Sequence, residues 1–213
     1  MKKRSGKTVR AQASKGPRRR RLRSFSPGNA VFLVGFMGAG KSSVGRALGQ
    51  LLSWDFEDLD DRIERREGRS VAEIFREAGE LGFRRAEHGA LRQVLEDLPS
   101  TARVIALGGG AFVQEKNAML LKSSGVATVF LDAPVDELWK RCSRQANDTG
   151  AERPLLGSRE QFKKLYETRR KTYKKASIMI QTGNRAVDAI AAEIIETLEL
   201  KKIELRVQEG EVE

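Results

Sequence analysis

Short apolar runs alternate with longer segments of helical periodicity through most of the chain. Five segments are expected to be strands: Ala30–Val34, Trp54–Asp58, Val104–Leu107, Val126–Leu131 and Ser177–Gln181. Most of these runs are continuously apolar rather than alternating, as in strands that are buried on both faces of a sheet. Because helical patterns separate the runs, the sequence predicts an α/β fold in which helices cover both faces of a parallel sheet.

Seven segments are expected to be helices: Lys41–Leu52, Asp61–Arg66, Val71–Ala78, Phe83–Leu98, Asp136–Arg144, Glu160–Lys175 and Ala186–Leu198. In Val71–Ala78 and Phe83–Leu98, apolar residues recur at three- and four-residue steps, as on one face of a helix. The stretch Gln145–Ser158 is rich in polar residues and contains Gly and Pro, so we expect a mobile loop without a helix there. Ligands bind outside the carboxyl ends of the strands in such sheets, and two glycine-rich turns follow predicted strands.

The domain boundaries follow from breakers and from charge. A Ser-Pro-Gly breaker precedes Asn29, so one folded domain is expected at residues 29–200, a length that suits a single core. Residues 201–213 are alternating and charged, and we expect them to fray.

The net charge of +11 comes from the N-terminal end of the chain. Residues 1–28 hold 11 of the 40 Lys and Arg residues and no Asp or Glu, so residues 29–213 carry 29 basic and 29 acidic side chains. The domain itself is therefore charge-balanced, and its charge gives no reason to expect nucleic acid as its main partner. Residues 1–28 are expected to be a flexible basic tail, with a nucleic-acid or membrane role for the tail as the alternative.

Cys142 is the only cysteine and His88 the only histidine of the chain. A lone cysteine forms neither an intramolecular disulfide nor a cysteine metal cluster, and it favours a reducing, cytoplasmic setting. Any catalytic triad or multi-histidine metal site would have to rest on His88 alone. We therefore expect structural roles for both residues, and core or cleft-wall positions for Trp54 and Trp139. The sequence has no run of about 18 apolar residues, so no membrane span is predicted.

Residues 35–42, GFMGAGKS, match the phosphate-binding pattern G-x-x-x-x-G-K-[ST] in full. The pattern follows a predicted strand and opens a predicted helix, which is the context that it requires. Its glycines allow backbone N–H groups to turn towards phosphate oxygens at the positive end of the helix dipole. Lys41 is expected to reach the β- and γ-phosphates, and the Ser42 hydroxyl to ligate Mg²⁺. The pattern predicts nucleotide binding, but GTPases, ATPases and small-molecule kinases all share it.

An acidic pair, Asp58 and Asp60, stands at the end of the second predicted strand. Carboxylates at i and i+2 on a strand end project to the same side. One could then serve Mg²⁺ while the other contacts an acceptor hydroxyl and takes its proton, as a kinase requires. A helix cap is the alternative explanation, since Asp is common at that position.

Four further features are candidate ligand contacts, but each of them is weak evidence when taken alone. Gly108–Gly110 follow a predicted strand, where glycines let the backbone approach a ligand closely. Arg153 lies in the predicted loop, and from a closing lid it could stabilise charge on a transferring phosphoryl group. Arg84 and Arg169 lie on predicted helices. Taken singly, the arginines are better explained as solvent-exposed side chains, and the glycines are as well explained by a flexible turn.

Four segments together resemble the shikimate kinase family in order and spacing. They are GFMGAGKSSVGRALG, FEDLDDRIERREGRSVAEIFREAGELGFRRAE, LGGGAF, and ERPLL followed by LYETRRKTY. The resemblance implies a three-layer P-loop fold of the nucleoside-monophosphate-kinase type, with a five-stranded parallel sheet flanked by helices and a mobile lid. It also implies transfer of the γ-phosphate of ATP, with Mg²⁺, to the 3-hydroxyl of shikimate, in the biosynthesis of chorismate and the aromatic amino acids.

The resemblance further implies roles for individual residues. Nucleotide contacts are implied for Gly38, Ala39, Gly40, Lys41, Ser42, Ser43, Arg153 and Arg185, and metal contacts for Ser42 and Asp58. Substrate contacts are implied for Asp60, Arg84, Gly108, Gly109, Gly110 and Arg169, with Lys41, Asp60 and Arg153 as catalytic residues. Arg84 and Arg169 would grip the shikimate carboxylate, for which two fixed guanidinium groups are chemically suited.

The chain departs from the family pattern at two places. Lys171-Thr172-Tyr173 stands where the family often has Pro-Leu-Tyr, which bears on the packing of that helix rather than on Arg169. The family's late arginine near the adenine is offset here, and Arg185 is the nearest candidate.

Three alternatives remain at this point. A gluconate-type or other small-molecule kinase would share the phosphate loop, but it would not need Asp58, Asp60, Arg84 and the three glycines together. A non-catalytic nucleotide-binding protein would be expected to have lost one of Lys41, Asp60, Arg84 or Arg169. A nucleic-acid-binding protein would act through the basic tail. We expect a monomer whose partners are ATP and shikimate, since nothing in the sequence marks a large apolar interface.

Overall fold

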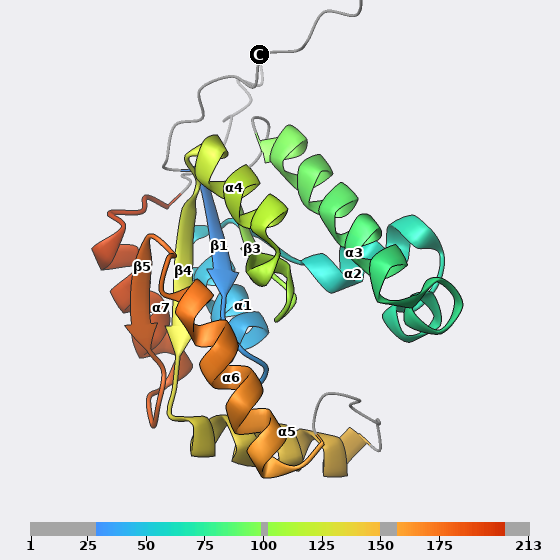
Figure 1. Cartoon of the computed structure of the whole chain (residues 1–213). Coiled ribbons are helices and arrows are strands. Elements are labelled where there is room, and N and C mark those ends of the chain that lie inside the picture. Colours follow the sequence, from blue (N-terminus) through green and yellow to red (C-terminus); the bar gives the residue numbers. More distant parts are fainter. Residues whose placement is uncertain (1–28, 99–101, 150–156, 203–213) are drawn as a thin grey trace, which may run out of the picture.

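Five parallel strands form one sheet at the centre of the molecule (Figure 1). The computed structural model describes residues 29–98, 102–149 and 157–202. The strands are β1 (Ala30–Val34), β2 (Asp55–Asp58), β3 (Arg103–Ala106), β4 (Ala127–Asp132) and β5 (Ile178–Gln181). They pair in the order β2-β3-β1-β4-β5, and every pair is parallel. The predicted α/β fold with a parallel sheet is confirmed.

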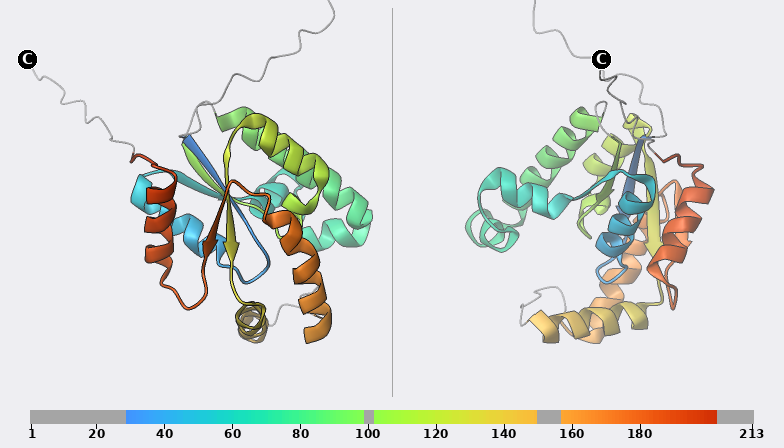
Figure 2. Two further views of the ribbon diagram at one scale, coloured as in Figure 1. Left: turned by 60° about the vertical axis from the view of Figure 1, so that its left-hand side comes forward. Right: turned by 180° about the vertical axis from the view of Figure 1, so that it is seen from behind.

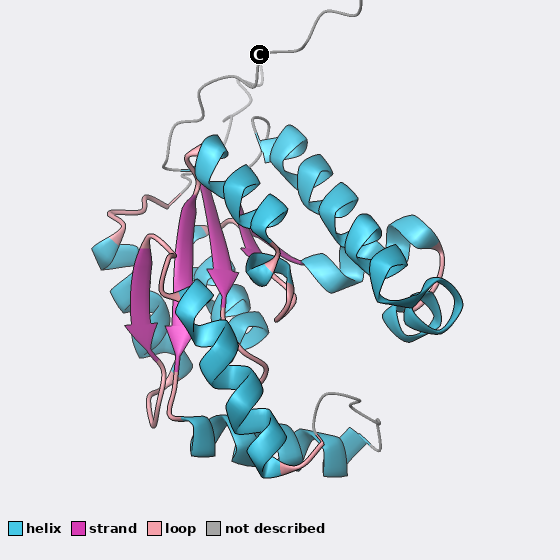
Figure 3. Cartoon of the chain, in the orientation of Figure 1, coloured by secondary structure: helices cyan, strands magenta, loops and turns pink. Residues whose placement is uncertain are grey.

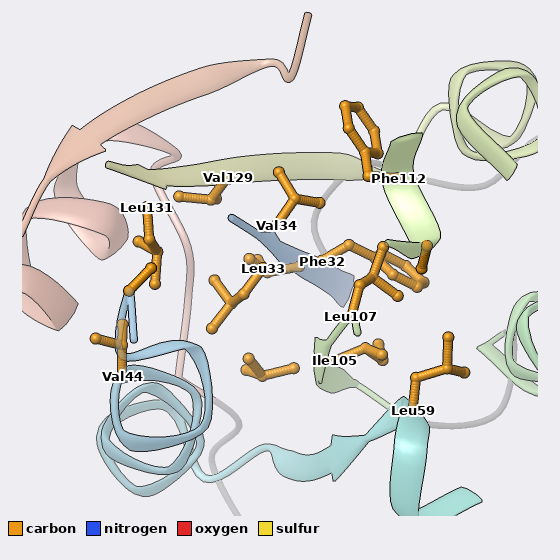
Figure 4. Close-up of a cluster of buried hydrophobic side chains, with 14 of the residues drawn as sticks. Phe32, Leu33, Val34, Val44, Leu59, Ile105, Leu107, Phe112, Val129 and Leu131 are labelled. Carbon is orange, nitrogen blue, oxygen red and sulfur yellow. The ribbon is translucent and has the colours of Figure 1, made fainter. Parts of the chain in front are cut away.

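The central strand β1 is buried on both faces. The exposed fraction of its five side chains is 0–1%, and it pairs with β3 on one side and with β4 on the other. Figure 4 shows side chains of β1, β3 and β4 meeting those of the flanking helices, among them Val44 and Leu59. The continuous apolar run AVFLV therefore matches the environment of a central parallel strand.

The helices cover both faces of the sheet (Figures 2 and 3). Helices α1 and α7 pack together on one face, while α4 and α6 lie on the other, and α5 runs across the carboxyl ends of the strands (Figure 1). Their bounds are Lys41–Leu52 (α1), Leu59–Glu67 (α2), Val71–Asp97 (α3), Glu115–Ser124 (α4), Val135–Thr149 (α5), Arg159–Tyr173 (α6) and Val187–Thr197 (α7). None of these helices is long and apolar enough to cross a bilayer.

Three helices differ from the sequence prediction. The two helices expected at Val71–Ala78 and Phe83–Leu98 are the arms of α3, which kinks at Gly79 (φ 65°, ψ −174°). Helix α4 was not predicted, because it is short and its buried residues include the polar Asn117. The expectation that residues 145–158 lack a helix was wrong for residues 145–149, where α5 continues through polar sequence without apolar periodicity.

Parts of the expected architecture lie outside the described residues. The basic tail at 1–28 and residues 203–213 belong to these parts, and so does the centre of the predicted lid, residues 150–156. The domain boundaries at 29 and 200 and the mobility of the lid therefore stay predictions.

Helix α1 lies unusually close to β2 because two glycines face the strand. A Cβ atom on Gly45 would lie 2.3 Å from the Phe56 ring, and one on Gly49 would lie 2.8 Å from the Trp54 carbonyl oxygen. Real Cβ atoms do not approach other atoms so closely, so a side chain at either position would have to push the helix off the sheet. The close approach holds the start of β2 against the helix that follows the phosphate loop.

Gly49→Ala is expected to lower the free energy of unfolding by about 1–3 kcal/mol, because the new methyl group meets a backbone carbonyl that cannot turn away. In an open helix position the same change would stabilise the protein by up to about 1 kcal/mol. Urea unfolding measures the difference. Gln50→Ala, at an exposed position of the same helix, should change the value by less than about 0.5 kcal/mol. A Gly49→Ala protein as stable as the unmodified chain would contradict the close contact.

Candidate active site

The loop between β1 and α1 forms an anion-binding turn. Gly40 caps α1 with a left-handed backbone (φ 89°) and offers no side-chain cap, and the first turn of the helix has no acidic residue. The positive end of the helix dipole therefore points into the loop without a carboxylate to neutralise it. The Lys41 Nζ donates to the carbonyl oxygens of Gly35 (3.1 Å) and Phe36 (3.2 Å), which holds the lysine across the loop.

A cavity of about 930 Å³ opens beside this loop. Its walls come from the phosphate loop, the start of α2, the turn after β3, helix α5 and the segment that follows β5. Eleven of the residues predicted for a site line it: Gly38, Ala39, Gly40, Lys41, Ser42, Ser43, Asp58, Asp60, Gly108, Gly109 and Arg185. These eleven residues converge at the carboxyl ends of the strands, where parallel sheets bind ligands. The predicted residues Arg84, Gly110 and Arg169 are not among those that line the cavity.

Asp58 and Asp60 both line the cavity, but their backbone positions differ from the prediction. Asp58 ends β2 and caps α2, since its Oδ1 accepts from the Asp60 backbone N–H at 3.1 Å. Its other oxygen accepts from the Ser42 hydroxyl at 2.9 Å. Asp60 lies in the first turn of α2 rather than on the strand. The prediction that both side chains project from a strand end was wrong, and the cap explanation holds for Asp58.

One carboxylate oxygen of Asp60 lacks a donor: Oδ1 is buried and makes no hydrogen bond within the described residues. Burial, followed by the charge of Asp58, raises the pKa of Asp60 to about 6, although the Lys41 ammonium opposes the change. A buried acceptor without a donor costs free energy, so this oxygen is suited to a donor supplied by a ligand.

The turn at Gly108–Gly110, called the glycine turn below, lies against Asp60, Arg84 and Arg169. A Cβ atom on Gly108 would lie 2.8 Å from Asp60 Oδ1, and one on Gly110 would lie 2.7 Å from both terminal nitrogens of Arg84. From helix α6, Arg169 donates to the Gly109 carbonyl oxygen at 3.4 Å. A larger residue at Gly108 would displace Asp60, and one at Gly110 would displace Arg84, so the close approach explains these two glycines. A Cβ atom on Gly109 would meet no atom closer than 3.8 Å.

Glu87 is a buried carboxyl group that the sequence analysis missed. Its exposed fraction is 1%, and both of its oxygens accept from Arg84 Nη1, at 3.0 and 3.1 Å. Burial raises the pKa of Glu87 to about 7, and the Arg84 guanidinium lowers it only in part. Glu80 contacts the same guanidinium at 3.2 Å from an exposed position. The three-residue spacing of Arg84 and Glu87 on a helix was the available signal for this pair.

Asn117 joins α3 to the glycine turn. Its exposed fraction is 1%, and its amide nitrogen donates to the carbonyl oxygen of Ala111 at 3.0 Å. Its amide oxygen lies 2.7 Å from His88 Nδ1, so this histidine nitrogen is the donor. His88 stands one helical turn after Arg84. The contact therefore fixes the helix that carries Arg84 relative to the turn that meets it.

Arg141 on α5 lines the cavity, and the sequence analysis missed this residue too. Its guanidinium donates to the carbonyl oxygens of Gly38 (3.2 Å) and Thr182 (3.1 Å), so it links the phosphate loop to the segment after β5. Arg185 donates to the Gln181 carbonyl oxygen at 2.9 Å and lines the same side. The predicted catalytic residue Arg153 lies outside the described residues.

A family model, two relatives and a solved structure all indicate the same protein family. The family model described as shikimate kinase matches residues 37–199 of this chain. The shikimate kinase of Persephonella marina is 39% identical over 166 residues, which cover 78% of this chain and 96% of that protein. The shikimate kinase of Aquifex aeolicus is 37% identical over 170 residues, or 79% and 95% of the two chains. A solved structure of shikimate kinase from Acinetobacter baumannii in complex with shikimate superposes with a TM-score of 0.72 at 35% identity, covering 84% of this chain and 97% of that one.

Glu87→Gln should change the pH dependence of stability. Because the pKa of Glu87 rises from 4.5 to about 7 on folding, its proton stabilises the folded state at low pH, and this contribution is lost as the pH rises through 7. Between about pH 4 and pH 8, the unmodified chain should therefore lose on the order of 3 kcal/mol of unfolding free energy relative to the variant. Urea unfolding across this range measures the loss.

The control for that measurement is Glu80→Gln, which alters an exposed carboxylate on the same arginine. Its pH profile should run parallel to that of the unmodified chain. Parallel profiles for Glu87→Gln as well would contradict the raised pKa of Glu87.

Proposed function

This chain belongs to the shikimate kinase family, and on that basis we propose that it transfers the γ-phosphoryl group of ATP to the 3-hydroxyl of shikimate, giving 3-phosphoshikimate and ADP. The observation that carries the proposal is the arrangement around the glycine turn. Two arginines and an unpartnered carboxylate oxygen meet there, beside an anion-binding loop. A substrate with a carboxylate at one end and a hydroxyl at the other matches these groups.

The substrate carboxylate lies between Arg84 and Arg169 in this proposal. The two guanidinium groups come from different helices, and they lie at neighbouring residues of the turn, Arg84 at Gly110 and Arg169 at Gly109. Two fixed forks set the orientation of a carboxylate as well as its affinity. Glu87 holds Arg84 in place, and the side chain of Phe36 lies under Arg169, with 5.8 Å between the guanidinium carbon and the ring centre. Orientation matters because phosphoryl-transfer enzymes act largely by positioning.

Asp60 is the proton acceptor of the proposed reaction. Its unpartnered Oδ1 receives the hydrogen bond of the shikimate 3-hydroxyl, and its pKa of about 6 leaves it ionised at neutral pH. As the hydroxyl oxygen forms its bond to the γ-phosphorus, its proton passes to Asp60. The bond from phosphorus to the bridging oxygen breaks, and its electron pair leaves with ADP.

The nucleotide phosphates lie in the loop between β1 and α1, against the helix dipole and Lys41. The Ser42 hydroxyl and the Asp58 carboxylate touch at 2.9 Å and face the cavity. Such hard oxygen donors fit Mg²⁺, so we assign these two residues to the ion. When bound, Mg²⁺ neutralises charge on the phosphates. Ser43 and Arg185 are proposed as further nucleotide contacts, and Arg153 as the arginine that reaches the transferring group from the lid.

We further propose that the protein acts as a monomer in the cytoplasm. The exposed large apolar side chains of the described residues are scattered over several elements, namely Leu51, Phe75, Leu81, Met119, Met179 and Val187. Scattered apolar side chains need no partner to cover them. Cys142, the single cysteine of the chain, is buried, and a lone buried cysteine suits a reducing compartment.

Arg84→Ala is expected to lower kcat/KM for shikimate by about 10²-fold or more, mainly through KM, because the substrate carboxylate loses charge-assisted hydrogen bonds. ADP formation from ATP and Mg²⁺ measures this, with gluconate in place of shikimate as the substrate control. Arg85→Ala removes an exposed arginine next to it and should stay within about twofold of the unmodified chain. Equal losses in the two variants, or no turnover with shikimate at all, would contradict the proposal.

Asp60→Asn is expected to lower kcat by about 10²- to 10⁴-fold with little change in the KM for ATP, because the amide cannot take the hydroxyl proton. The kcat/KM of the unmodified chain should rise as the pH passes through about 6, where Asp60 ionises, and this rise should be missing from the residual activity of the variant. Asp61→Asn, which alters the exposed neighbour, is the control. A kcat close to that of the unmodified chain would exclude Asp60 as the base.

A further inference from the structure

A further buried carboxylate, Asp132, lies outside the cavity at the end of β4. Asp132 has an exposed fraction of 2%, and its side chain collects donors from two other elements. Tyr166 donates its hydroxyl hydrogen at 2.6 Å, and Arg170 donates through Nη2 at 2.6 Å and through Nε at 3.1 Å. Gln181, at the end of β5, adds an amide contact at 3.3 Å. None of these groups lines the cavity between the phosphate loop and α5.

The two donors on α6 stand one helical turn apart, next to the residues that face the glycine turn. Tyr166 and Arg170 form one stripe of the helix and bind Asp132. Arg169 and Tyr173 form the neighbouring stripe, and both donate to the Gly109 carbonyl oxygen. Successive helical residues point about 100° apart, so the rotation of α6 about its axis decides where Arg169 points. A carboxylate gripped at two successive turns fixes that rotation.

The electrostatics keep this anchor in its charged form. Burial alone would raise the pKa of Asp132, but the hydrogen bonds from Arg170, Tyr166 and Gln181 lower it below its usual value. The pKa of Tyr166 is raised, first by burial and then by its bond to Asp132, so the phenol remains a donor. The forked contact from Arg170 adds directionality that a single point charge would lack.

We infer that Asp132 is a positioning residue for the acceptor site: through Arg170 and Tyr166 it sets the rotation of α6 at which Arg169 meets the substrate carboxylate. This inference rests on the proposed function. A purely structural ion pair would affect stability and leave the affinity for shikimate unchanged. In this inference the effect of Asp132 on shikimate binding passes through Arg169, and a double-mutant cycle of the two residues detects such a dependence.

The test combines Asp132→Asn with Arg169→Ala. Asn keeps the shape of the side chain, removes its charge and turns one acceptor oxygen into a donor that faces Arg170. In the unmodified background we expect the KM for shikimate to rise by about 10-fold, with the KM for ATP changed by less than about threefold. In the Arg169→Ala background the same change should add less than about twofold, because the arginine that Asp132 positions is absent. Tyr166→Phe, a milder change, should shift the KM in the same direction to a smaller extent.

The control is Thr128→Val on the same strand. Thr128 is buried and lies at the opposite end of β4 from Asp132. Its hydroxyl oxygen is 3.1 Å from the hydroxyl oxygen of Ser177. Loss of the Thr128 hydroxyl should lower stability without changing the KM for shikimate. Equal factors for Asp132→Asn in the two backgrounds, or an equal rise in KM for Thr128→Val, would overturn the inference while leaving the proposed function intact. Failure of the unmodified chain to phosphorylate shikimate would overturn the proposed function and the inference together.

Discussion

The burial of β1 between two parallel neighbours is the constraint from which the active-site region follows. Because all five side chains of β1 are inside the core, the strand cannot shift along β3 or β4 without exposing apolar surface to water. The chain leaves this fixed strand at Gly35, where a side chain has no room because a Cβ would lie 2.6 Å from the Leu131 carbonyl oxygen of β4. The phosphate loop thus inherits its position from the most deeply buried part of the sheet.

The residues around the glycine turn include charged groups that are partly or fully removed from water, which costs free energy unless the charges are paired. Asp60 and Glu87 both have a raised pKa, and in each case loss of water is the largest cause. The arginines that face them are held by more than one group, Arg84 by two glutamates and Arg169 by a backbone carbonyl and an aromatic ring. A substrate carboxylate would complete this set of charges, and a substrate hydroxyl would satisfy the remaining oxygen of Asp60. The site is therefore organised before the ligand arrives, which reduces the ordering that binding requires.

The sequence predicted the elements more reliably than the contacts between them. Apolar runs such as AVFLV identified the strands, because a central parallel strand is buried on both faces. The glycine–lysine pattern located the phosphate loop, because that turn needs those residues locally. Helix α4 has no clear apolar stripe, and α5 continues into polar sequence, so periodicity missed the first and shortened the second. Arg141 and Asn117 take their roles from partners on other elements, and no local pattern records such partners. The spacing of Glu87 and Arg84 on one helix is visible in the sequence, but the burial of Glu87 depends on the surrounding fold. For the same reason, only the family resemblance could bring Arg84 and Arg169 together at one turn.

The order of the strands in space has a consequence for how the molecule is made. The chain supplies β1 first, yet the neighbours of β1 are β3 and β4, which follow only at residues 103–106 and 127–132. During synthesis the most apolar strand therefore leaves the ribosome long before anything can pair with it. Its two open edges make the growing chain prone to aggregation and suited to capture by a chaperone. A chain that stops before residue 127 has no sheet on one side of the phosphate loop, so truncated products of this protein should be insoluble rather than partly active.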